Sequence, residues 1–254
     1  MKTGEVATDR TVLRIGGKDR VDFLQGLVTN DVTRGGLIWA ALLTPQGKYL
    51  FDFFLLDQGD VLLLDVKAEV ADALVQRLSM YRLRADVSID AAGVSVTRGL
   101  GDAPDGALPD PRHPDLGWRA YDLAGDGDTP AINWDAIRVA HNIPETGIEL
   151  IANDSYPLEC GFERLHGVDF RKGCYVGQEV TARMKHKTAL RKGLALVEIE
   201  GAAPVGTEII ADGKSAGTLF TQSGGHAIAY LRFDRATGDM CAGDASVTLA
   251  DLPA

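Results

Sequence analysis

The stretch RKGCYVGQE, residues 171–179, places one cysteine behind two cations and between two glycines. Glycine accepts unusual backbone torsions and close approach by a ligand, and a helix is expected from about residue 178 to residue 185. Neighbouring Lys and Arg side chains and a helix N-terminus both favour a thiolate over a thiol. The stretch therefore predicts a reactive thiol at Cys174, with a small buried residue in a tight turn as the alternative.

The sequence around this stretch is strongly basic, although the protein as a whole is acidic. Residues 164–192 hold eight Lys or Arg against two acids, whereas the rest of the chain holds 18 basic against 34 acidic residues. The formal charge of −10 argues against non-specific binding of nucleic acid by the whole surface, and no specific binding of DNA is expected. The basic segment predicts a local anionic ligand or partner, unless it is simply the solvated face of a helix.

Before this segment the sequence follows an α+β pattern. Residues 11–15, 37–44, 48–56 and 60–66 are apolar enough for strands, with a Pro-Gln-Gly turn at 45–47. Apolar spacing predicts helices around residues 21–28 and 70–81, and Asn133 is placed to cap a short helix. Residues 99–115 are rich in Pro and Gly and are expected to form a loop.

After residue 193 the pattern changes to short apolar segments separated by Gly, Pro and Asp. Such segments predict a small antiparallel barrel or sandwich without helices. We therefore expect two domains, an α+β region over residues 1–188 and a β-barrel over residues 189–254.

Composition disfavours several classes of protein. The longest apolar run, residues 37–43, is too short for a membrane span, and residues 1–10 have neither a secretory core nor an Arg/Ser-rich transit pattern. Three widely spaced cysteines and unpaired histidines predict neither a disulfide framework nor a metal site. We expect a cytoplasmic protein that does not bind membranes.

Several motifs together resemble a known family. Residues 172–179, KGCYVGQE, resemble the K-G-C-Y/F-x-G-Q-E signature of the YgfZ-type folate-binding proteins, which include a mitochondrial iron–sulfur assembly branch and are related to the glycine cleavage T-protein, an aminomethyltransferase. Residues 23–32, FLQGLVTNDV, are similar to the family's FLQGQ-x-TND-V segment. Arg138 with residues 143–147, and the P-x-E step at 157–159, resemble two further elements.

The resemblance implies a T-protein-like α+β body, in which antiparallel sheets and helices form three lobes around a channel for tetrahydrofolate, followed by the C-terminal β-barrel. Glu159 matches the carboxylate that holds the pterin ring in relatives, and a carboxylate can accept two N–H bonds from an aminopyrimidinone edge. Asp52 falls near the essential aspartate of the T-protein, whose pattern has two adjacent acids where this chain has one. The alternative for Asp52 is an outward-facing polar residue on a half-exposed strand.

Further candidate folate contacts follow from the same resemblance. Thr29, Asn30 and Asp31 would line the channel, unless they cap the end of a helix. The anionic polyglutamate tail of a folate would suit the basic segment, although Arg183, Lys185 and Lys187 could instead simply solvate a helix. The candidate set is completed by Lys172, Gly173, Tyr175, Gly177, Gln178, Glu179 and Arg183, with Cys174 and Asp52 as candidate catalytic groups.

Three functions are compatible with these features. The leading hypothesis is a tetrahydrofolate-binding accessory protein for the assembly or repair of iron–sulfur enzymes, including radical enzymes that modify tRNA, with client or assembly proteins as partners. The second is a folate-dependent one-carbon transferase in which Asp52 orients an amine donor, and the missing second acid, the K-G-C motif and the short chain count against it. The third is a non-catalytic interaction module that docks an acidic protein or RNA through its basic face.

Overall fold

The computed structural model describes residues 3–123, 131–186 and 190–251. The chain forms two compact units, which are described separately. Unit 1 comprises Met1–Gln46, Leu50–Ile132 and His166–Gln178, and unit 2 comprises Gly47–Tyr49, Asn133–Leu165 and Glu179–Ala254. Segments of the two units alternate along the sequence, so this division differs from the expected cut between residues 188 and 189, which stays a prediction.

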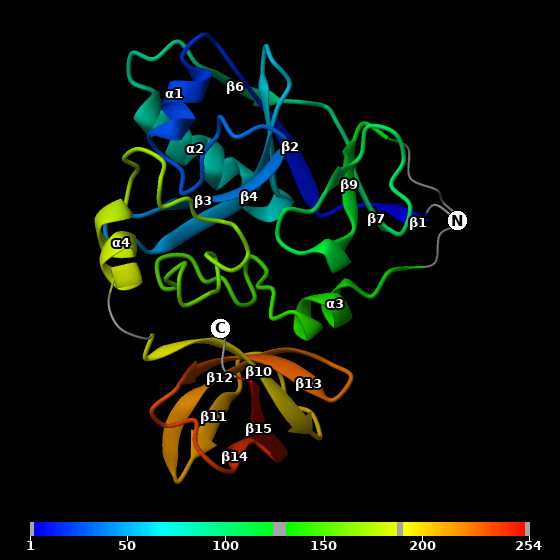
Figure 1. Ribbon diagram of the computed structural model, residues 1–254, viewed down its shortest axis with the longest axis vertical. Coiled ribbons are helices and arrows are strands. Elements are labelled where there is room, and N and C mark those ends of the chain that lie inside the picture. Colours follow the sequence, from blue (N-terminus) through cyan, green and yellow to red (C-terminus); the bar gives the residue numbers. More distant parts are fainter. Residues whose placement is uncertain (1–2, 124–130, 187–189, 252–254) are drawn as a thin grey trace. The chain divides into compact units, whose positions relative to one another are not determined.

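A five-stranded sheet forms the main part of unit 1 (Figure 1). Its strand order is β3 (Leu37–Leu43), β4 (Tyr49–Asp57), β5 (Leu62–Lys67), β2 (Arg10–Gly16) and β6 (Ser88–Ala91). Every residue of β3 and the first seven residues of β4 are buried, which explains their nearly uninterrupted apolar sequence. The strands expected between residues 11 and 66 are confirmed.

Two helices pack their apolar stripes against this sheet. They are α1 (Arg20–Gln25) and α2 (Ala71–Arg82), the second preceded by the short 3₁₀ helix η1 (Ala68–Val70). Leu24, Leu74 and Leu78 are fully buried in the core that the helices share with the strands. The helix predicted around residues 21–28 is shorter than expected, because Gly26 already ends α1.

A four-stranded sheet completes unit 1, in the order β1 (Thr3–Val6), β7 (Val96–Leu100), β9 (Trp118–Tyr121) and β8 (Leu108–Pro109). The loop expected over residues 99–115 is therefore wrong in part, because β8 and the 3₁₀ helix η2 (Pro114–Leu116) lie within or across it. Pro109 sits on an edge strand and Pro114 at a helix start, two positions where the missing N–H group is tolerated.

Unit 2 contains a short helix, α3 (Trp134–Ala140), and most of a longer one, α4 (Gln178–His186). Asn133 caps α3 as predicted, since its side-chain oxygen accepts a hydrogen bond from the Ala136 N–H at 3.0 Å. The helix expected from residue 178 is confirmed by α4. No helix among the described residues is long and apolar enough to cross a membrane.

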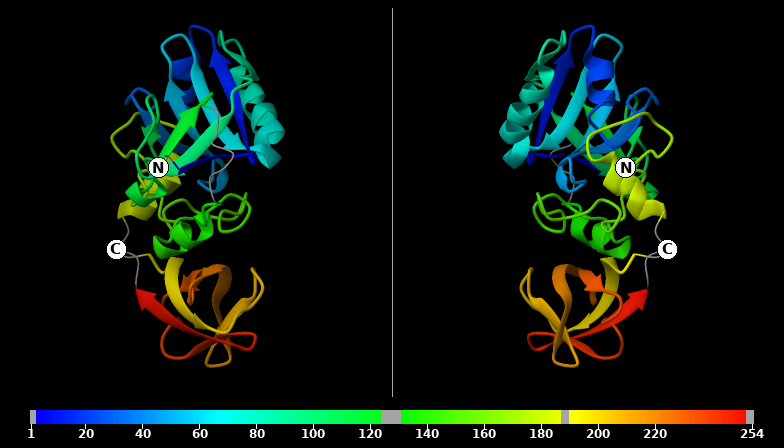
Figure 2. Two further views of the ribbon diagram at one scale, coloured as in Figure 1. Left: turned by 90° about the vertical axis from the view of Figure 1, so that its right-hand side faces the viewer. Right: turned by 90° about the vertical axis from the view of Figure 1, so that its left-hand side faces the viewer.

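The C-terminal part of unit 2 is a closed six-stranded barrel, whose strands run from yellow to red in Figure 2. The strand order is β10 (Lys192–Glu200), β13 (His226–Arg232), β12 (Lys214–Ser223), β11 (Glu208–Ala211), β14 (Met240–Ala242) and β15 (Ala245–Asp251). Its interior is filled largely by small side chains, among them Ala195, Ala229 and Ala242. Closure of the sheet decides between the barrel and the sandwich that the sequence left open.

Candidate functional site

A pocket of about 930 Å³ lies within unit 2 and contains Glu159. The barrel strands β10, β12 and β13 contribute most of its lining, and α4 contributes Met184. Polar and charged groups dominate this lining, including Glu159, Tyr230, Arg191, Lys192, Arg232 and Asp234. A pocket of this size that contains a few convergent polar groups is the usual form of a small-molecule site.

The backbone of β10 holds Glu159 in this pocket. The Leu194 N–H donates to the Glu159 carbonyl at 2.7 Å, and Gly193 makes that approach possible. A Cβ atom at Gly193 would lie 2.7 Å from the Glu159 carbonyl oxygen, which is closer than real Cβ atoms come. The glycine before β10 thus positions the carboxylate that the sequence singled out.

Glu159 and Tyr230 form a short hydrogen-bonded pair. The Tyr230 hydroxyl donates to Glu159 Oε2 at 2.6 Å. Burial raises the pKa of Glu159, against the opposing effects of the Tyr230 hydrogen bond and the Lys192 charge. Burial and the neighbouring carboxylate also raise the pKa of Tyr230, so the phenol stays protonated and keeps donating. Among the described residues, Glu159 Oε1 has no hydrogen-bond donor, so one acceptor oxygen remains for a ligand.

Cys174 lies in unit 1 and is exposed, whereas Cys160 is buried and burial raises its pKa to about 12. The structure therefore favours an accessible thiol over the buried alternative for Cys174. Of the two flanking glycines, Gly177 adopts a φ of 84°, a torsion that favours glycine. Gly173 has no such torsion, and a Cβ atom placed there would meet nothing within 4 Å.

Lys172 anchors the loop that carries Cys174. Its buried ammonium donates to the carbonyl oxygens of Gln25 at 2.8 Å and Val28 at 2.6 Å, just beyond the end of α1. The ammonium also lies 5.2 Å from the centre of the Tyr175 ring. Burial lowers the pKa of Lys172 to about 8, against the effects of Asp31 and Asp169. Lys172 acts here as a structural tether, while its predicted folate contact stays a prediction.

Thr29 and Asn30 complete the same anchor. The Thr29 hydroxyl donates to the Gly167 carbonyl at 2.7 Å, and the Asn30 amide donates to the His166 carbonyl at 2.7 Å. Both side chains are buried. They do not cap α1, because that helix already ends at Gly26. Residues 25–32 and 166–172, which resemble two separate family motifs, thus hold each other in place.

Asp31 and the remaining signature residues make local contacts. Asp31 Oδ1 accepts from the Thr33 N–H at 3.0 Å and the Thr33 hydroxyl at 2.7 Å, and these bonds lower its pKa. Gln178 Oε1 accepts from the Tyr175 N–H at 3.3 Å, beside the start of α4. Glu179 and Arg183 are exposed on α4, and neither lines the described pocket.

Asp52 is buried on β4, which overturns the alternative of an outward-facing polar residue. Its Oδ2 accepts from the Trp39 indole N–H at 2.9 Å. Phe51 occupies the position of the T-protein's second acid and belongs to the hydrophobic core. The missing acid is thus replaced by a core side chain, and the site cannot supply two adjacent carboxylates.

A buried ionic network next to Asp52 was not predicted from the sequence. Asp65 accepts from Arg10 at 2.6 Å and from Arg119 at 3.1 Å, and both guanidinium groups lie over the Phe54 ring. Asp110 pairs with Arg112 and Arg119, and these cations outweigh burial and lower the pKa of Asp110 to about 2. The pairs join strands of both sheets of unit 1, so the network is a structural clamp.

The basic segment separates into groups with different partners. Arg164 donates to the carbonyls of His141 and Asn142, and Lys185 pairs with Glu163. Arg191 and Lys192 instead line the Glu159 pocket. Lys187, which the interaction hypothesis used, lies outside the described residues. The local charge of the sequence therefore does not form one continuous ligand site.

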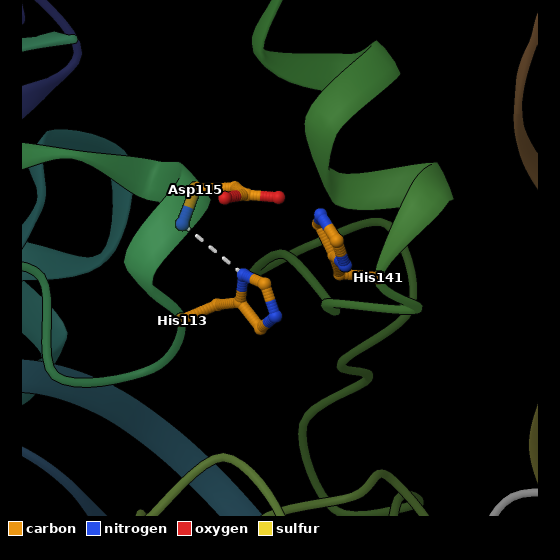
Figure 3. Close-up of side chains that lie close together, drawn as sticks. All are labelled: His113, Asp115 and His141. Atoms are coloured by element: carbon orange, nitrogen blue, oxygen red, sulfur yellow. Dashed lines mark hydrogen bonds between the residues drawn. The ribbon is translucent and has the colours of Figure 1, made fainter. Parts of the chain in front are cut away.

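Figure 3 draws three side chains of types that bind metal ions, His113, Asp115 and His141. His113 Nδ1 accepts from the Asp115 N–H at 3.2 Å within unit 1, at the start of η2. His141 follows α3 in unit 2. We assign no metal site to them, because they belong to units whose relative positions are not determined.

The fold has counterparts among known proteins. Residues 191–253 match the family model described as the CAF17 C-terminal β-barrel domain. The crystal structure of a glycine cleavage system aminomethyltransferase T from Bartonella henselae superposes with a TM-score of 0.74, over 99% of this chain and 86% of that one. The sequence identity is 12%, so this likeness concerns the fold alone. The predicted T-protein-like fold with a C-terminal barrel is confirmed.

Similar sequences carry one kind of name. An iron–sulfur cluster assembly factor IBA57 homolog from Neurospora crassa is 32% identical over 81% of this chain, and the IBA57 proteins of Mus musculus and Homo sapiens are each 29% identical over 91% of it. The chain is similar to IBA57 iron–sulfur cluster assembly factors. It spans 55% of the Neurospora relative and 78% of each mammalian relative. The narrower YgfZ-type assignment stays a prediction.

The same relatives contradict the expected cytoplasmic location. All three are named as mitochondrial proteins. The cytoplasmic prediction was wrong because it rested on the residue pattern of positions 1–10, which is indirect evidence of where a folded protein works.

Proposed function

We propose that this protein is an iron–sulfur cluster assembly factor that binds tetrahydrofolate in the Glu159 pocket. Similarity to IBA57 factors over 81% to 91% of the chain supports the assembly role. The observation that carries the folate assignment is the Glu159–Tyr230 pair within a pocket of about 930 Å³. Iron–sulfur clusters are the cargo of this function rather than a resident cofactor.

The donor and acceptor pattern of the pocket fits a reduced pterin. Its aminopyrimidinone edge presents N–H donors, and Glu159 offers an oxygen that no described residue occupies. Tyr230 holds the carboxylate in one orientation, which reduces the conformational freedom lost when a ligand binds. When bound, tetrahydrofolate supplies a carrier for one-carbon groups. The chain itself supplies the carboxylate that orients the ring.

Cys174 is the group that we assign to the assembly role. It is exposed, and the Lys172 tether and the Thr29 and Asn30 hydrogen bonds hold its loop in a fixed conformation. An exposed thiol on a held loop can meet a client or assembly protein. The signature around Cys174 further favours clients of the YgfZ type, which include radical enzymes that modify tRNA.

A one-carbon transferase is the weaker assignment. Phe51 stands in the hydrophobic core where the T-protein has its second acid, and the Asp52 carboxylate is bonded to Trp39. A folate-binding protein without transferase turnover agrees better with these positions. The interaction module without folate is the outcome that the following experiment can reveal.

Calorimetric titration with tetrahydrofolate tests the proposal. We expect the wild-type protein to bind, and Glu159→Gln to weaken binding roughly tenfold or more, because a hydrogen bond to a charged group contributes about 1.5–3 kcal/mol. Glu163→Gln, in an exposed acid of the same segment, serves as the control and should bind like the wild type. No binding by the wild type, or equal binding by Glu159→Gln, would contradict the folate assignment.

A further inference from the structure

We propose that Lys192, Arg232 and Arg191 form an anion subsite at the Glu159 pocket, which binds the carboxylates of a folate polyglutamate tail. The inference rests on the proposed folate binding. It goes further by naming the form of the ligand that the pocket prefers and the residues that select it. The basic segment of the sequence did not separate these cations from the others.

The first observation is a pair of like charges that face each other. Lys192 on β10 lies directly opposite Arg232 on β13 in an antiparallel register, so the two side chains share one face of the barrel wall. Both side chains line the pocket, and both are exposed. Like charges in directly opposite positions destabilise a sheet. An anion between them would turn this repulsion into two favourable contacts.

The second observation is the position of these cations relative to Glu159. The Lys192 ammonium lies 5.6 Å from the centre of the Tyr230 ring, and Tyr230 is hydrogen-bonded to Glu159. Arg191 directly precedes Lys192 and lines the same pocket. The pocket therefore has a carboxylate acceptor and a cluster of cations side by side. A ligand that fits both has a neutral N–H edge and an anionic extension.

The charge balance favours several carboxylates over one. Three cations and two acids, Glu159 and Asp234, line the pocket, and Asp234 pairs with Arg232 at 3.5 Å. If Glu159 is taken up by the ring edge, the three cations face one remaining acid. A tail with additional glutamates adds one carboxylate at each step, whereas a single glutamate offers few contacts to three separate cations.

The test is calorimetry with 5-formyltetrahydrofolate carrying either one or five glutamates. We expect the five-glutamate form to bind the wild type about five- to tenfold more tightly at low salt, since each exposed ion pair adds a modest amount. High salt should reduce this advantage. Lys192→Gln and Arg232→Gln should each reduce it while leaving the one-glutamate affinity nearly unchanged. Lys214→Gln, an exposed cation of β12 outside the pocket lining, should leave the advantage intact.

The outcomes separate the subsite from the folate proposal. Equal affinity for both forms in the wild type, or an advantage that survives in both variants, overturns the subsite but leaves folate binding in place. Absence of binding for both forms overturns the two proposals together. A tetraglutamate peptide without the pterin serves as a third probe. If it displaces the five-glutamate form at equal concentration, the cations belong to an acidic peptide, and the assignment to a folate tail is wrong.

Discussion

At the scale of single residues, the function depends on side chains whose charge is controlled by burial. Lys172 is the clearest case, because its ammonium is buried against two carbonyl oxygens beside the loop of Cys174. Glu159 is the second, since burial raises its pKa and Tyr230 fixes its orientation. Both residues are charged groups that the fold holds out of water, and both therefore link binding or stability to pH.

The pKa of Lys172 predicts a pH-dependent stability. Its pKa falls from 10.5 to about 8 on folding, so between these values the unfolded chain binds more protons than the folded one. The contribution of Lys172 to the free energy of unfolding should therefore rise as the pH increases from about 8 to 10.5. Urea unfolding of the wild type and of Lys172→Met across this range measures it as a growing difference. Lys18→Met, at an exposed position of unit 1, should give a constant difference, and a constant difference for Lys172→Met would contradict the account.

At the scale of elements, glycines decide how closely strands and turns approach. Gly193→Ala should lower the free energy of unfolding by about 1–3 kcal/mol, because its Cβ atom would lie 2.7 Å from the Glu159 carbonyl oxygen. The same variant should weaken tetrahydrofolate binding, since β10 would no longer hold Glu159. Gly173→Ala is the matched control and should change stability by less than about 0.5 kcal/mol, because it meets nothing within 4 Å. Equal stability losses for the two variants would show that the contact at Gly193 is unimportant.

Local sequence patterns predicted most of the elements, and long-range pairing explains what they missed. The apolar runs of β3 and β4, the Asn133 cap and the start of α4 follow from neighbouring residues. By contrast, Lys172 meets carbonyls 144 and 147 positions away, and Arg119 meets Asp65 across 54 positions. No local periodicity encodes such contacts. The Pro-rich residues 99–115 also hid the short strand β8, since edge strands tolerate Pro.

The candidate site was predicted in type better than in detail. Glu159 and Cys174 were found from motifs, and the structure gives the first a pocket and the second an exposed loop. Tyr230 was missed, because a tyrosine on a barrel strand looks like an ordinary wall residue until its register beside Glu159 is known. Thr29 and Asn30 were found but serve as anchors for a distant loop.

At the scale of the whole molecule, the account joins a T-protein-like fold to iron–sulfur cluster assembly. The fold is shared with an aminomethyltransferase, whereas the similar sequences are assembly factors. A fold does not carry a function by itself, so the distinction lies in the sites. Phe51 in place of a second acid disfavours transfer chemistry, and the exposed Cys174 favours an encounter with another protein.

Complementation of cells that lack their own IBA57-type factor tests this central claim most directly, with the activity of a [4Fe–4S] enzyme as the measurement. The account predicts that the wild-type chain restores this activity and that Cys174→Ser does not. Cys241→Ser, which changes another exposed cysteine, should restore it fully. Failure of the folded, expressed wild type would contradict the assembly role, and full restoration by Cys174→Ser would contradict the role of the thiol.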